Sequence, residues 1–205
     1  MIMKSHAFDM KKYNSLVALL LLLFFVTTGW AQNKYEREFR IKKSQFPENA
    51  YAYLTNELEN ANRIRYYKEI DSNKVSFEVK FKKDRLFYSI EFDSAGELED
   101  VEILIKEVDI PKSSLEAINA YLKENFTKYR IRKIQQQYSR VAFGSITNTL
   151  KKAFQNLIDP KINYELIVGG KTDGNYQDYE ILFDAEGNFI SLRKSLPANY
   201  DHVLY

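Results

Sequence analysis

The chain has 205 residues and no cysteine, and its 30 lysines and arginines nearly balance its 28 aspartates and glutamates. The missing cysteines exclude disulfides, thiolate chemistry and a lipid-modified cysteine. Removing residues 1–31 takes away three lysines and one aspartate and leaves a formal charge of zero, which argues against nucleic acid or an anionic membrane as a partner.

The first 31 residues have the three parts of a secretory signal. Lysines come first, an apolar run follows at Leu16–Val26, and the sequence Thr27-Thr28-Gly29-Trp30-Ala31 closes the segment. The apolar run has 11 residues, fewer than the roughly 20 that cross a bilayer. We therefore expect a cleaved signal peptide at 1–31 and a mature chain that begins at Gln32. This predicts a periplasmic or secreted protein without stable membrane insertion.

Three sequence landmarks occur twice and in the same order. They are residues 39–47 and 103–111, each ending in an apolar residue and proline; Arg63-Ile64-Arg65 and Arg130-Ile131-Arg132; and Tyr88-x-Ile90-x-Phe92-Asp93-x-x-Gly96 and Tyr179-x-Ile181-x-Phe183-Asp184-x-x-Gly187. Ordered self-similarity of this kind is typical of a duplicated supersecondary unit. The sequence predicts a first unit at 32–108 and a second at 109–205.

The pattern of the first unit predicts one helix and several strands. Pro47 suits a helix N-terminus, and apolar residues at helical spacing extend the helix from Glu48 to about Asn60. Alternation of apolar and polar residues predicts the strands, with one wet face and an antiparallel sheet. The expected strands are Tyr35–Ile41, Ile64–Ile70, Val75–Phe81, Leu86–Phe92 and Leu98 to about Ile105.

The second unit repeats this order, with a helix near Ser113–Phe126 and an insertion of about two dozen residues at 139–160. Within the insertion, apolar residues at helical spacing predict an amphipathic helix near 145–158, which either caps the core of the second unit or faces a partner. The favoured interpretation is the cap. The expected strands are Tyr129–Ile134, Tyr164–Val168, Tyr179–Phe183 and Phe189–Leu192.

These elements predict an α+β protein of two tandem units. Each unit is expected to be a helix packed on a four-stranded antiparallel sheet, with the inserted helix in the second unit.

Common catalytic groups are scarce, so no catalytic residue is assigned. The mature chain has one histidine, His202, close to its end. The pair Gly169-Gly170 lacks the residues of a phosphate loop and is predicted to form a tight hairpin. The acidic stretch with Glu97, Glu99, Asp100 and Glu102 offers carboxylates for acid–base chemistry, but a solvated strand edge is the favoured interpretation.

The two Asp-x-x-Gly sequences, at Asp93 and Asp184, suggest either calcium ligands or hairpin turns. Each turn has essentially one aspartate, whereas a calcium loop needs several oxygen donors. Hairpin turns are therefore favoured, with glycine at positive φ. No metal site and no cofactor is predicted.

One face of the predicted sheet carries apolar residues among charged ones, on the alternation phase opposite to the core. Such a mixed surface fits a protein partner, although the same face can instead pack against the other repeat. The candidate partner-binding residues are Arg65, Glu78, Lys80, Phe87, Arg132, Ile167 and Leu182.

An export signal followed by tandem units with an Asp-x-x-Gly hairpin before the last strand resembles the bacterial PepSY-like, beta-lactamase-inhibitor-like proteins. The residues that carry this resemblance are Phe77-Glu78-Val79 and Tyr164-Glu165-Leu166 together with the two Asp-x-x-Gly landmarks. The resemblance implies binding or inhibition of another envelope protein, and it carries over no catalytic motif.

The sequence thus predicts an exported, non-catalytic protein that binds an envelope protein through its sheet face. The alternative is a protein that binds or senses a small ligand or cation, with its cleft between the two units or under the inserted helix.

Overall fold

The computed structural model describes residues 32–34, 36–71, 74–172 and 175–195. The predicted signal peptide and His202 lie outside these residues. In the first half of the chain the elements are β1 (Gln32–Lys34), β2 (Glu36–Ile41), α2 (Glu48–Leu58), β3 (Asn62–Asp71), β4 (Lys74–Lys83), β5 (Leu86–Asp93) and β6 (Leu98–Leu104). In the second half they are α3 (Lys112–Asn125), β7 (Lys128–Ser139), α4 (Arg140–Phe143), α5 (Ile146–Gln155), β8 (Asn163–Thr172), β9 (Asn175–Asp184) and β10 (Phe189–Ser195).

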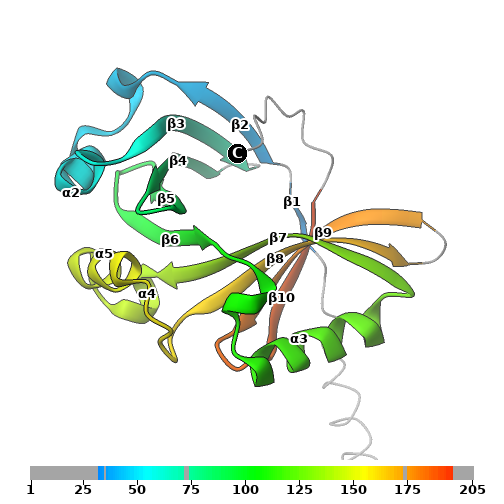
Figure 1. The fold of residues 1–205 in the computed structure, drawn as a ribbon. Helices are drawn as coiled ribbons and strands as arrows, with labels where there is room; N and C mark the ends of the chain where they lie inside the picture. Colours follow the sequence, from blue (N-terminus) through cyan, green and yellow to red (C-terminus); the bar gives the residue numbers. More distant parts are fainter. Residues whose placement is uncertain (1–31, 35, 72–73, 173–174, 196–205) are drawn as a thin grey trace, which may run out of the picture. The chain divides into compact units, whose positions relative to one another are not determined.

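All ten strands belong to one sheet, in the order β1-β10-β9-β8-β7-β6-β5-β4-β3-β2 (Figure 1). Strands β2 to β10 are antiparallel to their neighbours, and β1 is parallel to β10. The two halves join where β6 pairs with β7, with Val101 opposite Tyr138 and Ile103 opposite Gln136. The prediction of two units, each a helix on its own four-stranded sheet, is therefore wrong, because this pairing merges both halves into a single sheet.

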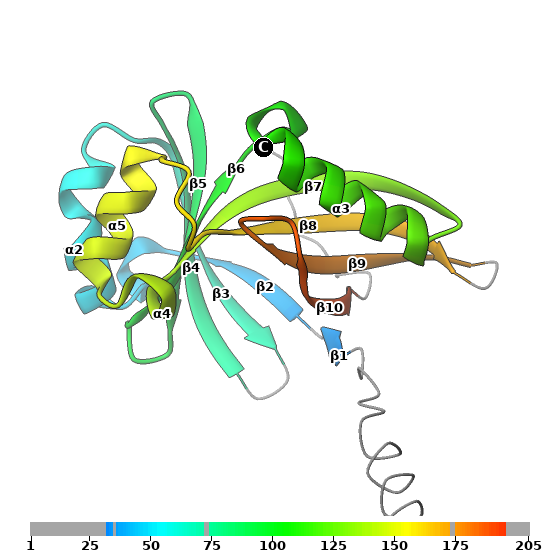
Figure 2. The same ribbon diagram turned by 90° about the horizontal axis from the view of Figure 1, so that it is seen from below.

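The helices cover one face of the sheet, and the buried side chains of that face form one hydrophobic cluster. Helices α2 and α5 lie over the first strands, whereas α3 runs along β7, β8 and β9 (Figure 2). Leu54 of α2 and Ile118 of α3 are both fully buried. On α3, Tyr121 stacks on Phe189 with ring centroids 4.7 Å apart, which fixes the helix over the last strands.

The recurring landmarks lie in matching local structures. Pro47 and Pro111 each precede a helix and follow a short 3-10 turn, Lys43–Gln45 and Glu107–Asp109. The backbone N–H of the residue before each turn donates to the side chain of the last residue of the turn. Fixed proline φ and the spare N–H groups of a first helical turn explain why proline stands at both helix starts. The predicted helix positions are confirmed to within two residues at each end.

The insertion forms α4 and α5, and α5 begins at Ser145, whose hydroxyl accepts a hydrogen bond from the Asn148 N–H. Phe154 of α5 packs against Tyr88 and Phe81, with centroids 5.2 and 6.4 Å away. The insertion also contacts β7, where the Tyr138 ring lies 5.7 Å from the Phe143 ring. It is thus a core cap, as favoured, but it covers the middle of the single sheet rather than a separate second core.

Gly169 and Gly170 lie inside β8, opposite Arg130 and Tyr129 of β7, so the prediction of a tight hairpin is wrong. A Cβ atom at Gly170 would lie 2.4 Å from the Phe126 ring. Glycine is needed here because the ring packs directly on the strand backbone.

The opposite face of the sheet is polar, and the curl of the sheet encloses it. The N-terminal segment pairs through β1 with one edge of the sheet and, after a single intervening residue, through β2 with the other edge. Arg193 of β10 lies 3.9 Å from Asp71 of β3, which shows that the two edges come together. As a result several polar side chains are buried with no helix over them: Glu69, Ser76, Glu78, Ser89, Glu102, Gln135 and Glu180. The predicted wet face is therefore largely an interior.

Candidate functional site

The residues predicted to bind a partner share the polar face of the sheet, but they differ in accessibility. Glu78 is 3% exposed and therefore cannot reach a macromolecular surface. Arg132 is exposed and pairs with Asp178 at 2.9 Å. Between these extremes, five residues are half-buried: Arg65, Lys80, Phe87, Ile167 and Leu182.

Glu38, Glu69 and Glu78 form a first carboxylate cluster, with one oxygen of each within 4.8 Å of the others. Lys80 enters this cluster, and its Nζ lies 2.7 Å from both Glu38 Oε1 and Glu78 Oε2. Burial raises the pKa of Glu38. Burial opposes ionisation of Glu78 as well, but Lys80 and hydrogen bonds outweigh it and lower the pKa of this carboxyl. This cluster thus has an internal ammonium as its counter-ion.

Glu91, Asp100 and Glu102 form a second cluster, again with one oxygen of each within 4.8 Å of the others. Asp100 and Glu102 lie on β6, in the middle of the sheet, so the predicted solvated strand edge is wrong for them. Gln137 Nε2 donates to Asp100 Oδ2 at 3.1 Å, and Gln135 Nε2 donates to Glu102. Within the described part of the chain, neither Asp100 nor Glu102 forms an ion pair.

Lys74 favours the charged form of Asp100 and Lys133 that of Glu102, but burial outweighs both. Burial raises the pKa of Asp100 to about 8, and the nearby Glu165 carboxylate adds to the effect. Burial, together with Glu165 and Asp100, raises the pKa of Glu102 well above its usual range. Closely spaced buried carboxylates cannot all ionise without a counter-ion. The cluster must therefore hold protons or bind a cation.

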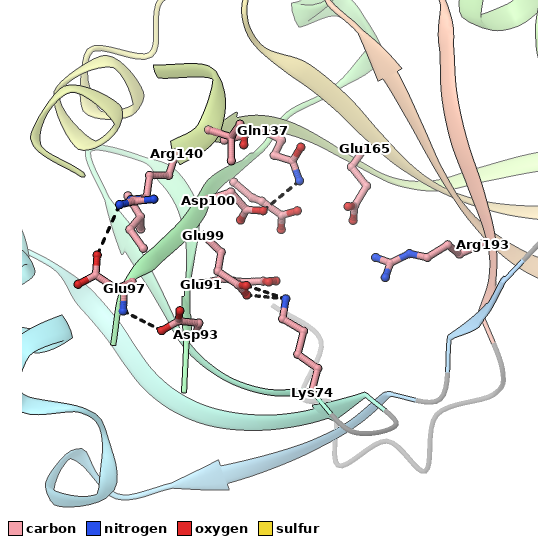
Figure 3. A pocket seen from close by; sticks show the side chains of 14 residues that line it. Lys74, Glu91, Asp93, Glu97, Glu99, Asp100, Gln137, Arg140, Glu165 and Arg193 are labelled. Atoms are coloured by element: carbon pink, nitrogen blue, oxygen red, sulfur yellow. Dashed lines mark hydrogen bonds and ion pairs between the residues drawn. The ribbon is translucent and has the colours of Figure 1, made fainter. Parts of the chain in front are cut away.

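A cavity of about 430 Å³ opens in front of the second cluster (Figure 3). Its cationic residues already have acidic neighbours: Lys74 lies 2.7 Å from Glu99, and Arg140 lies 3.7 Å from Glu97. Three cationic side chains line the cavity against seven carboxylates, so its wall is strongly acidic. The cationic residues are Lys74, Arg140 and Arg193, and the carboxylates are Glu91, Asp93, Glu97, Glu99, Asp100, Glu102 and Glu165.

The two Asp-x-x-Gly sequences form tight turns. Asp93 Oδ1 accepts hydrogen bonds from the Ala95 and Glu97 backbone N–H groups at 2.8 and 2.9 Å. Asp184 Oδ1 does the same for Glu186 and Asn188 at 3.1 and 2.8 Å. The glycines follow at positive φ, 78° for Gly96 and 88° for Gly187. Each aspartate thus supports its own turn, as the hairpin interpretation predicts.

The alternation pattern assigned the predicted partner-binding residues to a common face of the sheet, but it did not indicate the cavity. Asp100 and Glu102 alternate with Val101 and Ile103, which is the pattern of a strand with one polar face. The position of these residues between the two repeats could have indicated the site. A strand that joins two halves of a sheet pairs with a neighbour on each side, so it is not an edge strand.

Comparisons with known proteins support the fold. No protein-family model matches the chain. No curated protein matches it either. A solved structure from Bacteroides eggerthii, described as periplasmic, matches 75% of this chain and 92% of its own at 13% identity and a TM-score of 0.50. At these identities the likeness concerns the fold alone.

Two further solved structures match less closely. A DUF2874 family protein from Bacteroides ovatus matches 73% of this chain and 87% of its own, at 11% identity and a TM-score of 0.48. A BLIP-like protein from Bacteroides fragilis matches 78% of this chain and 92% of its own, at 10% identity and a TM-score of 0.46. The structural neighbours thus include a BLIP-like protein and a DUF2874 family protein. Among the described residues, no helix is long and apolar enough to span a membrane.

Proposed function

We propose that this protein is a non-catalytic binding protein of the cell envelope and that it holds a cationic ligand in the acidic cavity of its sheet. The single observation that carries this proposal is the charge of the cavity wall, seven carboxylates against three cationic side chains. A ligand with positive charge would relieve the repulsion among these groups, and the enclosed position strengthens each interaction by reducing solvent screening.

The location in the envelope rests on the sequence. Residues 1–31 have the organisation of a cleaved signal peptide, and a fold neighbour is described as periplasmic. An envelope protein meets the ions and cationic solutes of its surroundings directly, which suits a cavity that opens to solvent.

The non-catalytic part of the proposal rests on the chemistry of the cavity. The polar groups that contact Asp100 and Glu102 are glutamine amides, which orient a carboxylate but neither accept nor deliver a proton at neutral pH. An arrangement of carboxylates and amides suits the holding of a cation better than covalent chemistry.

The test is a thermal-shift screen of the purified, chelator-treated protein at pH 8 against spermidine and against the chlorides of magnesium and calcium. Sodium chloride at equal ionic strength serves as the solvent control. We expect at least one of these cations to raise the Tm, and we expect Glu165→Gln, which removes one charge from the cavity wall, to reduce the shift.

A matched control is Glu116→Gln on α3, where the side chain is 68% exposed and does not line the cavity. It makes the same change of charge and should respond like the unmodified protein. If no cation stabilises the protein more than sodium chloride does, or if Glu165→Gln responds like Glu116→Gln, the proposed function is wrong.

A second candidate is the binding of an envelope protein at the rim of the same sheet face. It is favoured by Arg132, which is exposed beside Asp178, and by Tyr176 nearby on β9, which is 66% exposed. Arginine and tyrosine are enriched in protein interfaces. Affinity capture from an envelope fraction, with a Phe87→Ala/Arg132→Ala double variant as control, tests it. A protein retained equally by both baits would contradict this choice of surface.

A further inference from the structure

We propose that Glu91, Asp100 and Glu102 form a binding site for a single hard divalent cation of about the size of calcium. This inference rests on the proposed function and names the class of cation and the residues that would hold it.

The geometry of the three carboxylates fits one ion. Glu91 lies on β5 and the other two lie on the adjacent β6, with Glu91 opposite Asp100 in the register of the sheet. One oxygen of each lies within 4.8 Å of the others. Oxygen ligands at about 2.4 Å from a calcium ion lie up to about 4.8 Å apart across it, so one ion can contact all three without movement of the strands.

One carboxylate oxygen of the cluster and one amide oxygen beside it lack hydrogen-bond partners, and the amide oxygen is an observation independent of the acidic clustering. Asp100 Oδ1 is buried and accepts no hydrogen bond. Gln135 is 3% exposed, its Nε2 donates to Glu102, and its Oε1 is buried without a partner. Unsatisfied buried oxygens are rare in folded proteins and cost about 1–3 kcal/mol each, so a missing ligand is a direct explanation.

The first carboxylate cluster shows how this protein neutralises a similar arrangement. There Lys80 Nζ lies 2.7 Å from two of the three carboxylates. Asp100 and Glu102 instead accept hydrogen bonds from glutamine amides, and Lys74 and Lys133 attract them through space without an ion pair to either among the described residues. A cation bound between Asp100 and Glu102 would take the place that Lys80 occupies in the first cluster.

The donors also define the kind of cation. Carboxylate and amide oxygens suit calcium, magnesium and manganese, whereas copper and zinc sites generally include imidazole or thiolate. The cavity in front of the cluster has room for the water molecules that complete the shell of such an ion.

The test is calorimetric titration of the chelator-treated protein with calcium chloride, and separately with magnesium chloride, in a buffer near pH 7.5. We expect one site per chain, with calcium bound more tightly than magnesium. The Asp100→Asn/Glu102→Gln variant preserves the size of both side chains and should weaken binding by more than about 100-fold, because loss of an outer-shell contact alone costs about 10–100-fold. Glu116→Gln should bind as the unmodified protein does.

Circular dichroism and the Tm in the presence of chelator show whether the double variant is folded. If it is folded and binds calcium as well as the unmodified protein does, or if the unmodified protein binds neither ion, the inference is overturned. If spermidine still stabilises the protein in a manner that depends on Glu165, the proposed function stands and only the metal site fails. If no cation acts, both fail.

Discussion

Replacing Asp100 with asparagine in the metal-free protein should raise its stability at neutral pH. The pKa of this carboxyl rises from 3.8 to about 8 on folding, chiefly because of burial. The folded protein therefore binds more protons than the unfolded chain between these two values, and stability falls as the pH rises from about 4 to about 8. At pH 7 the shift corresponds to about 4 kcal/mol at most, since each pKa unit is worth about 1.36 kcal/mol.

The opening of the cavity to solvent and the coupling to Glu102 make the actual destabilisation smaller than this upper limit. We therefore expect Asp100→Asn to increase the free energy of unfolding by about 1–2 kcal/mol at pH 7. For a protein of this size that gain raises the Tm by about 2–8 °C. The asparagine side chain keeps an oxygen that can accept the hydrogen bond from Gln137 Nε2.

Urea unfolding of both proteins at pH 5 and pH 8, in the presence of a chelator, measures the effect. The unmodified protein should be less stable at pH 8 than at pH 5. The free energy of unfolding of the variant should decrease less between these two pH values. Glu116→Gln, an exposed carboxylate, should differ from the unmodified protein by no more than about 0.5 kcal/mol. An unmodified protein that is equally stable at both pH values, or a variant that is less stable at pH 8, would refute the reasoning.

Lys80→Met should destabilise the protein by about 3–5 kcal/mol in urea unfolding, because it leaves buried carboxylates without their counter-ion. The control Lys74→Met, at an exposed site, should destabilise it by less than about 1 kcal/mol. Similar losses for both variants would contradict a buried role for Lys80. Gly187→Ala should lower the Tm more than Gly144→Ala, since both glycines have positive φ but only Gly187 would place a Cβ atom 2.4 Å from the backbone oxygen of Ser114. Equal decreases in Tm for the two variants, measured by calorimetry, would show that the backbone near Ser114 moves to accommodate the added Cβ atom.

Local structure was predictable because it depends on short-range patterns. Alternation of apolar and polar residues located nearly all the strands, and prolines with apolar residues at helical spacing located α2 and α3. The join between the two halves was not predictable, because β6 and β7 are separated by a helix and their pairing depends on tertiary packing. The same alternation fits two separate sheets or one continuous sheet.

The candidate site depended on the part that sequence could not reveal. Glu78 and Lys80 alternate with buried valine and phenylalanine, which is typical of a solvated sheet face. They are enclosed only because β1 pairs with β10 while β2 pairs with β3. Since that closure brings together the two ends of the described chain, no local pattern indicates it, and the buried carboxylates became visible only in the structure.

The acidic cavity is tested most directly by anomalous diffraction from crystals of the protein grown with manganese chloride, a hard divalent cation with a strong anomalous signal. A peak within bonding distance of the Asp100 and Glu102 carboxylates is the predicted result. A cavity with no anomalous peak, in crystals where manganese is bound only by exposed carboxylates elsewhere on the surface, would contradict it.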